Sequence, residues 1–428
     1  MGGLLLERRQ AIVEPKLSMH SLADLRAGKL AGSKRLDLSC GLVEFPAEIF
    51  ALADSLETLN LTGNRLCDLP DDLHRLRHLR VLFCSDNLFT ELPPSIGLCQ
   101  NLHIVGFKAN QITKVTAAAL PPSLRWLILT DNQIEQLPTE VGHCRSLQKL
   151  MLAGNRLSEL PASLAQCDKL ELLRIAANQL TELPEWLLKL PSLAWLAFAG
   201  NPLCPPHQPM PVKQIPWHQL AIEQQLGEGA SGVIQQARWQ TADQPTVAVA
   251  VKLYKGSVTS DGSPLNEMAA CIAAGKHRNL IGVEGQIADH PSAQAGLVMQ
   301  LIAPHFINLA GPPSLNSCTR DIYPDELRLT LPVALRMAHG IASVTAHLHE
   351  CGITHGDLYG HNILWNADGE CLLGDFGAAS FHCTSDNFES RALQRIEVRA
   401  FGILLGELLA RPGFAEIGRE LKQTLRPL

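Results

Sequence analysis

Two carboxylates and an amide lie close together in the second half of the sequence. The stretch 352–364 carries His355, Asp357 and Asn362 in the order H-x-D-L-x-x-x-N, and Asp375 opens a D-F-G triplet 13 residues after Asn362. One carboxylate can accept a proton from a hydroxyl group. A second carboxylate and an amide oxygen are suitable ligands for Mg²⁺. The spacing therefore favours a site that activates a hydroxyl group beside a metal ion.

A glycine-rich segment precedes this stretch by more than a hundred residues. Gly227, Gly229, Gly232 and Val233 form the pattern G-x-G-x-x-G-x-V. Glycines at these positions let backbone amides approach phosphate oxygens, which a side chain would block. Such a segment taken alone is usually only a turn, so its meaning depends on what accompanies it.

A lysine and a glutamate follow the glycines. Lys252 ends the apolar, strand-like run 246–252, where its charge is costly unless it meets an anion such as a nucleotide phosphate. Glu267 lies in the helix-like segment 264–271 and can pair with Lys252, although a solvated helix residue is the simpler interpretation of Glu267 alone.

The ordered series of glycine loop, lysine, glutamate, H-x-D-L-x-x-x-N and D-F-G resembles the protein-kinase family. The resemblance implies a two-lobed fold, ATP and Mg²⁺ as cofactors, and transfer of a phosphate to a protein hydroxyl group. It implies that Asp357 orients and deprotonates the acceptor, and that Asn362 and Asp375 bind Mg²⁺. Lys252 would bind the α- and β-phosphates, held in place by Glu267.

The same resemblance assigns the nucleotide site. It implies that the three glycines cover the phosphates, that three apolar residues enclose adenine, that Met299 is the gatekeeper, and that the next three residues form the hinge between lobes. The residues assigned to ATP are Gly227, Gly229, Gly232, Val233, Ala250, Lys252, Met299, Gln300, Leu301, Ile302 and Leu364.

The sequence departs from the family pattern at several positions. Gly356 stands where the family usually has an arginine that grips a phosphorylated activation loop, so switching by loop phosphorylation is not expected. Tyr359 stands where Ser/Thr kinases have a lysine, and Glu397 where the next helix usually offers aspartate. An A-P-E triplet is missing, and only about 17 residues follow that helix, which predicts a truncated C-lobe.

The first half is a repeat. An asparagine recurs at spacings of 23, 23, 22, 23, 23 and 23, each closing an L-x-x-L-x-L-x-x-N phrase, and Gly41 stands in its place 23 residues before the first. The asparagines are Asn64, Asn87, Asn110, Asn132, Asn155, Asn178 and Asn201. These residues resemble the leucine-rich repeat family over residues 30–203. The resemblance implies an α/β solenoid in which stacked coils form a curved parallel sheet. We expect the asparagines to bond backbone groups of neighbouring coils, a weakened first coil, and an irregularity at residues 115–122, where the repeat is one residue short.

The concave face of such a solenoid follows from the phrase, because its third, fifth and seventh positions point outward. The residues predicted to bind a protein partner there are Phe83, Ile104, Trp126, Ile128, Met151, Leu172, Arg174 and Trp195. Apolar surface of this extent usually marks a binding site. The alternative is that the second half of the chain covers part of it.

Composition sets the remaining limits. The 428 residues are 46% hydrophobic and 18% charged, with a net charge of −6, which argues against a chain that mainly coats nucleic acid or an anionic membrane. The sequence contains no apolar run long enough to span a membrane, so we expect no membrane-spanning helix. Its first ten residues have too short an apolar stretch for a secretory signal, so we expect none. Three of the twelve cysteines, Cys99, Cys144 and Cys167, recur three residues before a repeat leucine, as buried thiols would. We expect a reducing, cytoplasmic location, while delivery into another cell stays open.

The expected organisation is an N-terminal cap (1–30), about eight repeats (31–203), a Pro-rich linker (204–216) and a kinase-like domain (217–428) with lobes 217–300 and 301–428.

The leading hypothesis is a leucine-rich-repeat kinase of the soluble, bacterial type that phosphorylates Ser or Thr of a protein held by the repeats. One alternative is a nucleotide-binding scaffold of low activity, favoured by Gly356 and Tyr359. Another is a small-molecule kinase, because H-G-D-L-x-x-x-N also resembles that class.

Overall fold

The computed structural model describes residues 20–204, 211–229, 231–241, 244–255, 258–259, 261–385 and 387–410. These residues fall into two compact units. The first unit holds residues 20–193 and 200–203, and the second holds residues 194–199 together with the chain from Cys204 onward. The predicted cap and linker lie partly outside the described residues.

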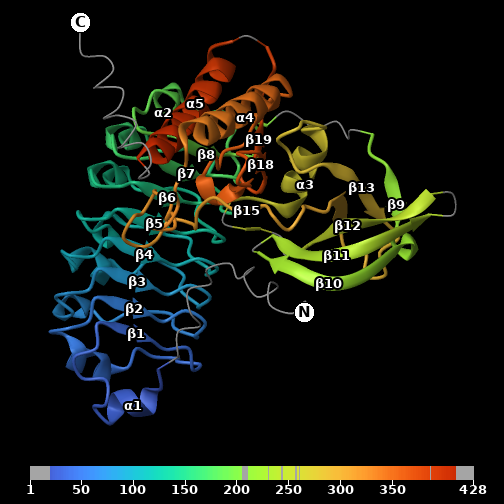
Figure 1. Ribbon diagram of the computed structural model, residues 1–428. Helices are drawn as coiled ribbons and strands as arrows, with labels where there is room; N and C mark the ends of the chain where they lie inside the picture. Colours follow the sequence, from blue (N-terminus) through green and yellow to red (C-terminus); the bar gives the residue numbers. More distant parts are fainter. Residues whose placement is uncertain are drawn as a thin grey trace, which may run out of the picture. The chain divides into compact units, whose positions relative to one another are not determined.

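Short parallel strands recur along the repeats and stack in sequence order (Figure 1). Neighbouring strands pair at equivalent phrase positions, as in Leu59 opposite Leu82 and Leu127 opposite Leu150. The strands are β1 (Arg35–Asp37), β2 (Thr58–Asn60), β3 (Val81–Phe83), β4 (Ile104–Gly106), β5 (Trp126–Ile128), β6 (Lys149–Met151), β7 (Leu172–Arg174) and β8 (Trp195–Ala197). The residues of β8 belong to the second compact unit.

Short helices connect the strands, and the Leu-Pro of the repeat explains where several of them begin. Pro93, Pro138, Pro161 and Pro184 each occupy the position before the first helical turn, where the fixed φ of proline suits the entry of the chain. The helices are α1 (Leu22–Arg26), η1 (Ala47–Leu52), η2 (Leu73–Arg75), η3 (Pro94–Leu98), η4 (Ala117–Ala119), η5 (Thr139–His143), η6 (Ala162–Gln166) and α2 (Glu185–Leu188), the η elements being 3₁₀ helices.

The repeat asparagines form a buried ladder, as the sequence predicts. Asn155 donates through Nδ2 to Leu129 O at 2.9 Å and to Leu152 O at 3.0 Å, and its Oδ1 accepts from Ile134 N at 3.0 Å. One side chain thus satisfies backbone groups in its own coil and in the preceding one. In the first coil, where Gly41 replaces the asparagine, Asn64 Oδ1 still accepts from Leu42 N at 3.0 Å.

The fourth repeat is one residue short, but this does not change the pairing of the strands on either side of it. Its strands keep the common register, with Ile104 opposite Trp126, so the missing residue is accommodated in the connection, which contains the helix η4. The one-residue deficit therefore lies between β4 and β5, in the stretch that includes residues 115–122. The repeat cysteines Cys99, Cys144 and Cys167 are buried, and all twelve cysteines of the chain are free thiols.

The predicted concave face is less open than expected. Phe83, Trp126, Ile128 and Met151 are only half-buried, but four other predicted partner residues are buried: Ile104, Leu172, Arg174 and Trp195. Within the open stretch the side chains also cover one another, since Trp126 Nε1 donates to Met151 Sδ at 3.2 Å. Of the eight predicted partner residues, the accessible ones therefore lie on β3, β5 and β6.

A six-stranded sheet forms the first lobe of the second unit, in the order β10-β11-β12-β14-β13-β9 (Figure 1). Its core contains Val249, Val251, Val298 and Ile287. The elements of this lobe are β9 (Gln214–Pro216), η7 (Trp217–Gln219), β10 (Leu220–Glu228), β11 (Gly232–Thr241), β12 (Gln244–Tyr254), α3 (Pro264–Ala273), β13 (Val283–Ala288) and β14 (Gly296–Gln300).

Part of the predicted linker belongs to this sheet. Residues Gln214–Pro216 form the edge strand β9, which runs parallel to β13 with Ile215 opposite Ile287. Proline is compatible with an edge strand because that strand need not donate on its outer side. The linker prediction was therefore too long at its C-terminal end, and residues 205–210 lie outside the described residues.

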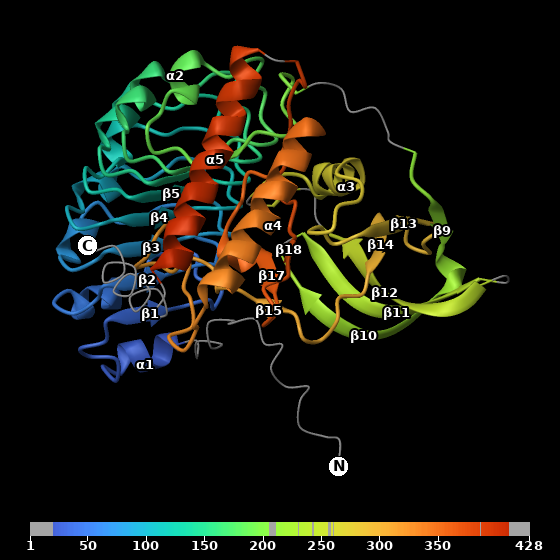
Figure 2. The same cartoon turned by 45° about the horizontal axis from the view of Figure 1, so that its top comes forward.

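Two long helices dominate the second lobe and run side by side, α4 (Leu331–Glu350) and α5 (Phe388–Leu409) (Figure 2). Short strands pair beside them in a three-stranded sheet, β15-β17-β18, and a two-stranded sheet, β16-β19. These elements are β15 (Ile307–Asn308), β16 (Ile353–Thr354), η8 (Gly360–Asn362), β17 (Ile363–Trp365), β18 (Cys371–Leu373) and β19 (Ser380–Phe381). Residues 411–428, to which the prediction of a truncated C-lobe refers, lie outside the described residues. Among the described helices, none combines the length and apolar character that crossing a bilayer requires.

The asparagine ladder can be tested by removing one member. We expect Asn155→Ala to lower the free energy of unfolding by about 3 kcal/mol, because it removes three buried hydrogen bonds and leaves Ile134 N without an acceptor. The two carbonyl oxygens keep the amides of Asn132 and Asn178 as donors. Urea unfolding followed by circular dichroism measures the change. The control is Asn101→Ala, whose single side-chain bond to Arg77 O is exposed and whose loss should cost less than about 0.5 kcal/mol. Equal effects of the two variants would contradict the ladder's role.

Candidate active site

Lys252 and Glu267 form a buried ion pair between strand β12 and helix α3. Their side chains are 12% and 2% exposed. Ser263 caps α3 by accepting from Leu265 N, which places Glu267 in the first helical turn. Burial alone would lower the pKa of Lys252, but the carboxylates of Glu267 and Asp375 outweigh it and raise the pKa above its usual value. The lysine therefore presents a fixed positive charge at neutral pH.

The glycine-rich segment is a tight turn between β10 and β11. Gly229 N donates to Gly232 O at 2.9 Å, and Glu228 pairs with Val233 where the two strands meet. A Cβ at Gly232 would lie 2.3 Å from Leu253 O, so that position requires glycine. Gly227 and Gly229 have nothing within 4 Å of the position of a Cβ. The backbone at these two glycines is thus accessible to a ligand.

The residues 355–362, which we call the H-G-D loop, follow β16 and end at β17. Asn362 Nδ2 donates to both Asp357 O and Asp357 Oδ2, each at 2.9 Å. This bond fixes the amide so that its oxygen remains for another ligand. His355 is buried, and its Nε2 donates to Gly374 O at 2.9 Å, which ties the loop to the residue before Asp375.

Asp375 has a strained backbone. Its φ is +55°, in the left-handed region that non-glycine residues seldom adopt, and its Oδ1 accepts from Gly377 N at 3.2 Å. Strain of this kind persists where surrounding contacts hold it and is common at functional sites. Phe376 is buried with its ring centroid 5.2 Å from that of His355. Asp375 and Asn362 together offer carboxylate and amide oxygens, the donor set that suits Mg²⁺.

The buried carboxylate of Glu397 holds the H-G-D loop by a hydrogen bond to its backbone. Glu397 on α5 accepts from Gly356 N at 2.9 Å and from His349 Nε2 at 2.7 Å. Burial alone would raise the pKa of Glu397, but these bonds and the nearby histidines hold it below its usual value. His349 lies in the last turn of α4, and its side chain is the partner of this buried charge.

His361 connects the acidic groups of the site. Its backbone N and its Nδ1 donate to the two carboxylate oxygens of Asp321, at 2.9 Å and 2.8 Å. Burial lowers the pKa of His361, but the bond to Asp321 and the carboxylates of Asp357 and Asp375 outweigh burial and raise it. Sequence reasoning missed Asp321, because it precedes His361 by 40 positions in a loop without a recognisable motif.

The other residues assigned to a nucleotide lie on β12, β14 and β17 or directly after β14. Ala250 pairs with Met299 across β12 and β14, and Leu364 lies on β17. Gln300 ends β14, and Leu301 and Ile302 follow it. These positions agree with a chain segment that joins the two lobes.

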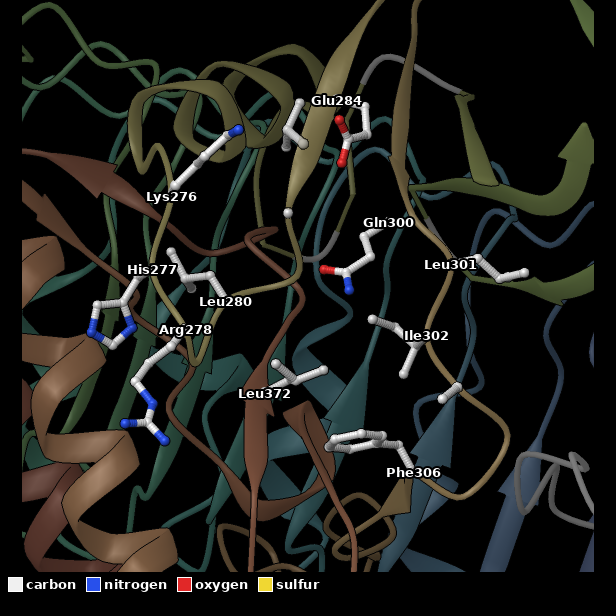
Figure 3. Close-up of a pocket in the computed structure, with 13 residues that line it drawn as sticks. Lys276, His277, Arg278, Leu280, Glu284, Gln300, Leu301, Ile302, Phe306 and Leu372 are labelled. Carbon is white, nitrogen blue, oxygen red and sulfur yellow. The ribbon is translucent and has the colours of Figure 1, made fainter. Parts of the chain in front are cut away.

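A cavity of about 510 Å³ opens beside this segment. Figure 3 shows Gln300 and Ile302 directed toward Leu280 and Leu372, with Arg278 turned away. None of Lys252, Asp357, Asn362 and Asp375 lines the cavity. It is therefore separate from the carboxylates and the lysine described above.

Comparisons with known proteins agree with this geometry. A family model described as protein tyrosine and serine/threonine kinase matches residues 220–408, and leucine-rich repeat models match residues 55–76 and 145–203.

Three curated relatives match parts of the chain. A probable serine/threonine-protein kinase, pats1 of Dictyostelium discoideum, is 36% identical over 48% of this chain and 7% of its own length. Ephrin type-A receptor 6 of Rattus norvegicus is 26% identical over 39% of this chain and 19% of its own length. Toll-like receptor 2 type-2 of Gallus gallus is 32% identical over 32% of this chain and 17% of its own length.

The chain thus spans less than a fifth of the length of each of these relatives, so the likeness concerns domains and not whole proteins. The chain carries leucine-rich repeats followed by a protein kinase domain.

Proposed function

We propose that the kinase domain transfers the γ-phosphate of ATP to a Ser or Thr hydroxyl group of a protein that the leucine-rich repeats capture. The observation that supports this most directly is the arrangement of charges in the two lobes. Lys252 is paired with Glu267, Asn362 is bonded to Asp357, and Asp375 acts electrostatically on Lys252. These are the groups that phosphoryl transfer requires.

The first task of the site is to bind and orient the nucleotide. The space beside Gly227 and Gly229 is open, so phosphate oxygens can approach the backbone of the glycine turn closely. The Lys252 ammonium supplies a positive charge whose direction is set by Glu267. Val233, Ala250 and Leu364 provide apolar surface for adenine. Orientation of this kind accounts for a large part of the rate in phosphoryl transfer.

The second task is to handle the acceptor proton. The oxygen of the acceptor hydroxyl forms a bond to the γ-phosphorus, the bond from that phosphorus to the β,γ-bridging oxygen breaks, and ADP leaves. Asp357 receives the hydroxyl proton, and Asn362 holds its carboxylate in place. Mg²⁺, when bound by Asn362 and Asp375, supplies positive charge against the phosphates.

A nucleotide-binding scaffold of low activity is the second candidate, and Tyr359 favours it. This residue stands at the position where Ser/Thr kinases have a lysine, and its ring is buried. The cationic contact that the lysine would make to the γ-phosphate is absent from that position, which slows transfer if no other group replaces it.

Capture of the acceptor by the repeats rests on the accessible part of the concave face. Phe83, Trp126, Ile128 and Met151 are aromatic or apolar and stay half-exposed on the strands β3, β5 and β6. Aromatic and methionine side chains are enriched at protein interfaces. We therefore assign acceptor binding to these four residues.

Replacing either carboxylate tests the reaction itself. Asp357→Asn and Asp375→Asn should each lower transfer of label from γ-labelled ATP to protein by about 100-fold or more, because each removes a group that acts on the transferred atoms. Asp368→Asn, at an exposed turn of the same lobe, is the control and should leave transfer unchanged. Nucleotide binding without transfer by the unaltered chain would support the scaffold, and label found only in small metabolites would support the small-molecule kinase.

The role of Lys252 is tested by nucleotide binding. We expect Lys252→Met to weaken binding of a non-hydrolysable ATP analogue about tenfold, which corresponds to about 1.4 kcal/mol, because it removes the charge that faces the phosphates. Isothermal titration calorimetry measures the affinity. The matched control is Lys255→Met, which removes a more exposed lysine of the same lobe that is paired with Glu228. Equal weakening by the two variants would count against a specific phosphate contact.

The concave face is tested by comparing two acceptors. The double variant Phe83→Ala with Ile128→Ala should reduce labelling of proteins in a cell lysate about tenfold, because it removes apolar anchors of the interface. Its transfer to casein, which needs no docking on the repeats, should stay unchanged. A parallel loss on both acceptors would indicate general damage to the chain and not loss of capture.

A further inference from the structure

The segment Ala194–Ala199 belongs to the same compact unit as the kinase domain, although it carries the last repeat strand, β8. Trp195 is 1% exposed, and its ring stacks on that of Tyr359 with centroids 4.2 Å apart and planes 10° apart. Its Nε1 donates to Leu358 O at 3.1 Å. Trp195, predicted from the sequence to bind another protein, thus contacts Leu358 and Tyr359 of the H-G-D loop, directly after Asp357.

The same segment also holds the chain that follows the D-F-G triplet. The backbone N–H groups of Phe198 and Ala199 both donate to Ser380 Oγ, at 3.0 Å and 3.1 Å. Ser380 is buried in β19, where it pairs with Thr354 of β16. Six residues therefore connect the strand that enters the H-G-D loop, the loop itself and the strand that follows Asp375.

This segment explains why position 356 is a glycine. The φ of Gly356 is +72°, and a Cβ there would lie 2.5 Å from Ala378 O and 2.7 Å from Leu196 O. The cavity left between Leu196, Gly356 and Glu397 is about 10 Å³, too small for more than one water molecule. An arginine cannot occupy this position, because the backbone of β8 passes through the space it would need.

Further ring contacts extend from Trp195 along the H-G-D loop toward Asn362, a predicted Mg²⁺ ligand. The guanidinium of Arg320 lies over the Trp195 ring, 5.6 Å from its centroid. On the loop, the Tyr359 ring lies 5.1 Å from the ring of His361, the residue before Asn362. Stacked aromatic rings of this kind restrict the motion of the backbone that carries them.

We propose that Ala194–Ala199 is a positioning element of the kinase, in which Trp195 holds the H-G-D loop so that Asp357 and Asn362 keep their places. The kinetic effects expected below rest on the proposed phosphotransfer. The expected effect on the mobility of the H-G-D loop rests on the contacts alone. The segment takes the place of the contact between an arginine and a phosphorylated activation loop, which the kinase resemblance would otherwise imply. Trp195 and Ser380 act through the loop and touch no substrate.

The test uses the full chain and four variants. Trp195→Ala removes the stack and the hydrogen bond, whereas Trp195→Phe keeps a ring and loses only the bond to Leu358 O. Ser380→Ala removes the acceptor of two backbone N–H groups. Trp186→Ala is the control, because Trp186 is a half-buried tryptophan in helix α2 of the same repeat.

The primary measurement is hydrogen–deuterium exchange of peptides that cover residues 355–362. Trp195→Ala should speed exchange there about tenfold or more and Ser380→Ala about threefold, because both release contacts that keep the loop closed. Trp195→Phe and Trp186→Ala should stay close to the unaltered chain. Unchanged exchange in Trp195→Ala overturns the proposal. If Trp195→Ala does not fold, unchanged exchange of residues 355–362 in Ser380→Ala overturns the proposal instead.

The kinetic measurement separates positioning from folding. With casein as acceptor, Trp195→Ala should lower kcat about tenfold while KM for ATP changes less than about threefold, because the loop and not the nucleotide lobe is disturbed. Trp195→Phe should restore most of kcat. A rise in KM with unchanged kcat overturns the positioning role. If the unaltered chain transfers no phosphate, the proposed function fails, whereas the exchange measurement still decides the structural claim.

Discussion

The H-G-D loop depends on one buried carboxylate. Glu397 lies on α5, accepts a hydrogen bond from Gly356 N and pairs with His349 of α4. A charge in this position is costly unless every partner is present, so the two long helices and the loop are stable only together. The bonds of Asn362 to Asp357 and of His355 to Gly374 O extend this support to both acidic residues of the site. Glu397, to which the proposed reaction assigns no step, thus supports the loop that carries Asp357 and Asn362.

Two departures from the kinase pattern have one geometric explanation. Gly356 is required because the backbone of β8 passes next to it, and Tyr359 lies under the ring of Trp195. An arginine at the first position and a lysine at the second would each remove a contact to Ala194–Ala199. The sequence differences that suggest a weakened enzyme are therefore also the differences that accommodate the last repeat strand.

Local patterns of the sequence predicted much of the fold. The repeat strands and the asparagine ladder follow from residues a few positions apart, and the ordered motifs located Lys252, Asp357 and Asp375. The contacts that complete the site connect distant positions, such as His349 with Glu397 across 48 residues and Phe198 with Ser380 across 182. Pairings at such separations depend on the packed fold and leave no periodic trace in a single sequence. The proline content of the linker likewise concealed β9, because an extended chain and an edge strand have similar backbone angles.

The repeat ladder has a consequence for how such a chain can evolve. The ladder asparagines bond backbone groups of their own coil and of the coil before it, so this support is not disturbed when whole coils farther away are gained or lost by duplication. The coil that contains Trp195 and Phe198 has no such freedom, because its strand is held by Leu358 and Ser380. Variation in the number of coils is therefore permitted at the N-terminal side of the array, while the final coil is constrained together with the enzyme.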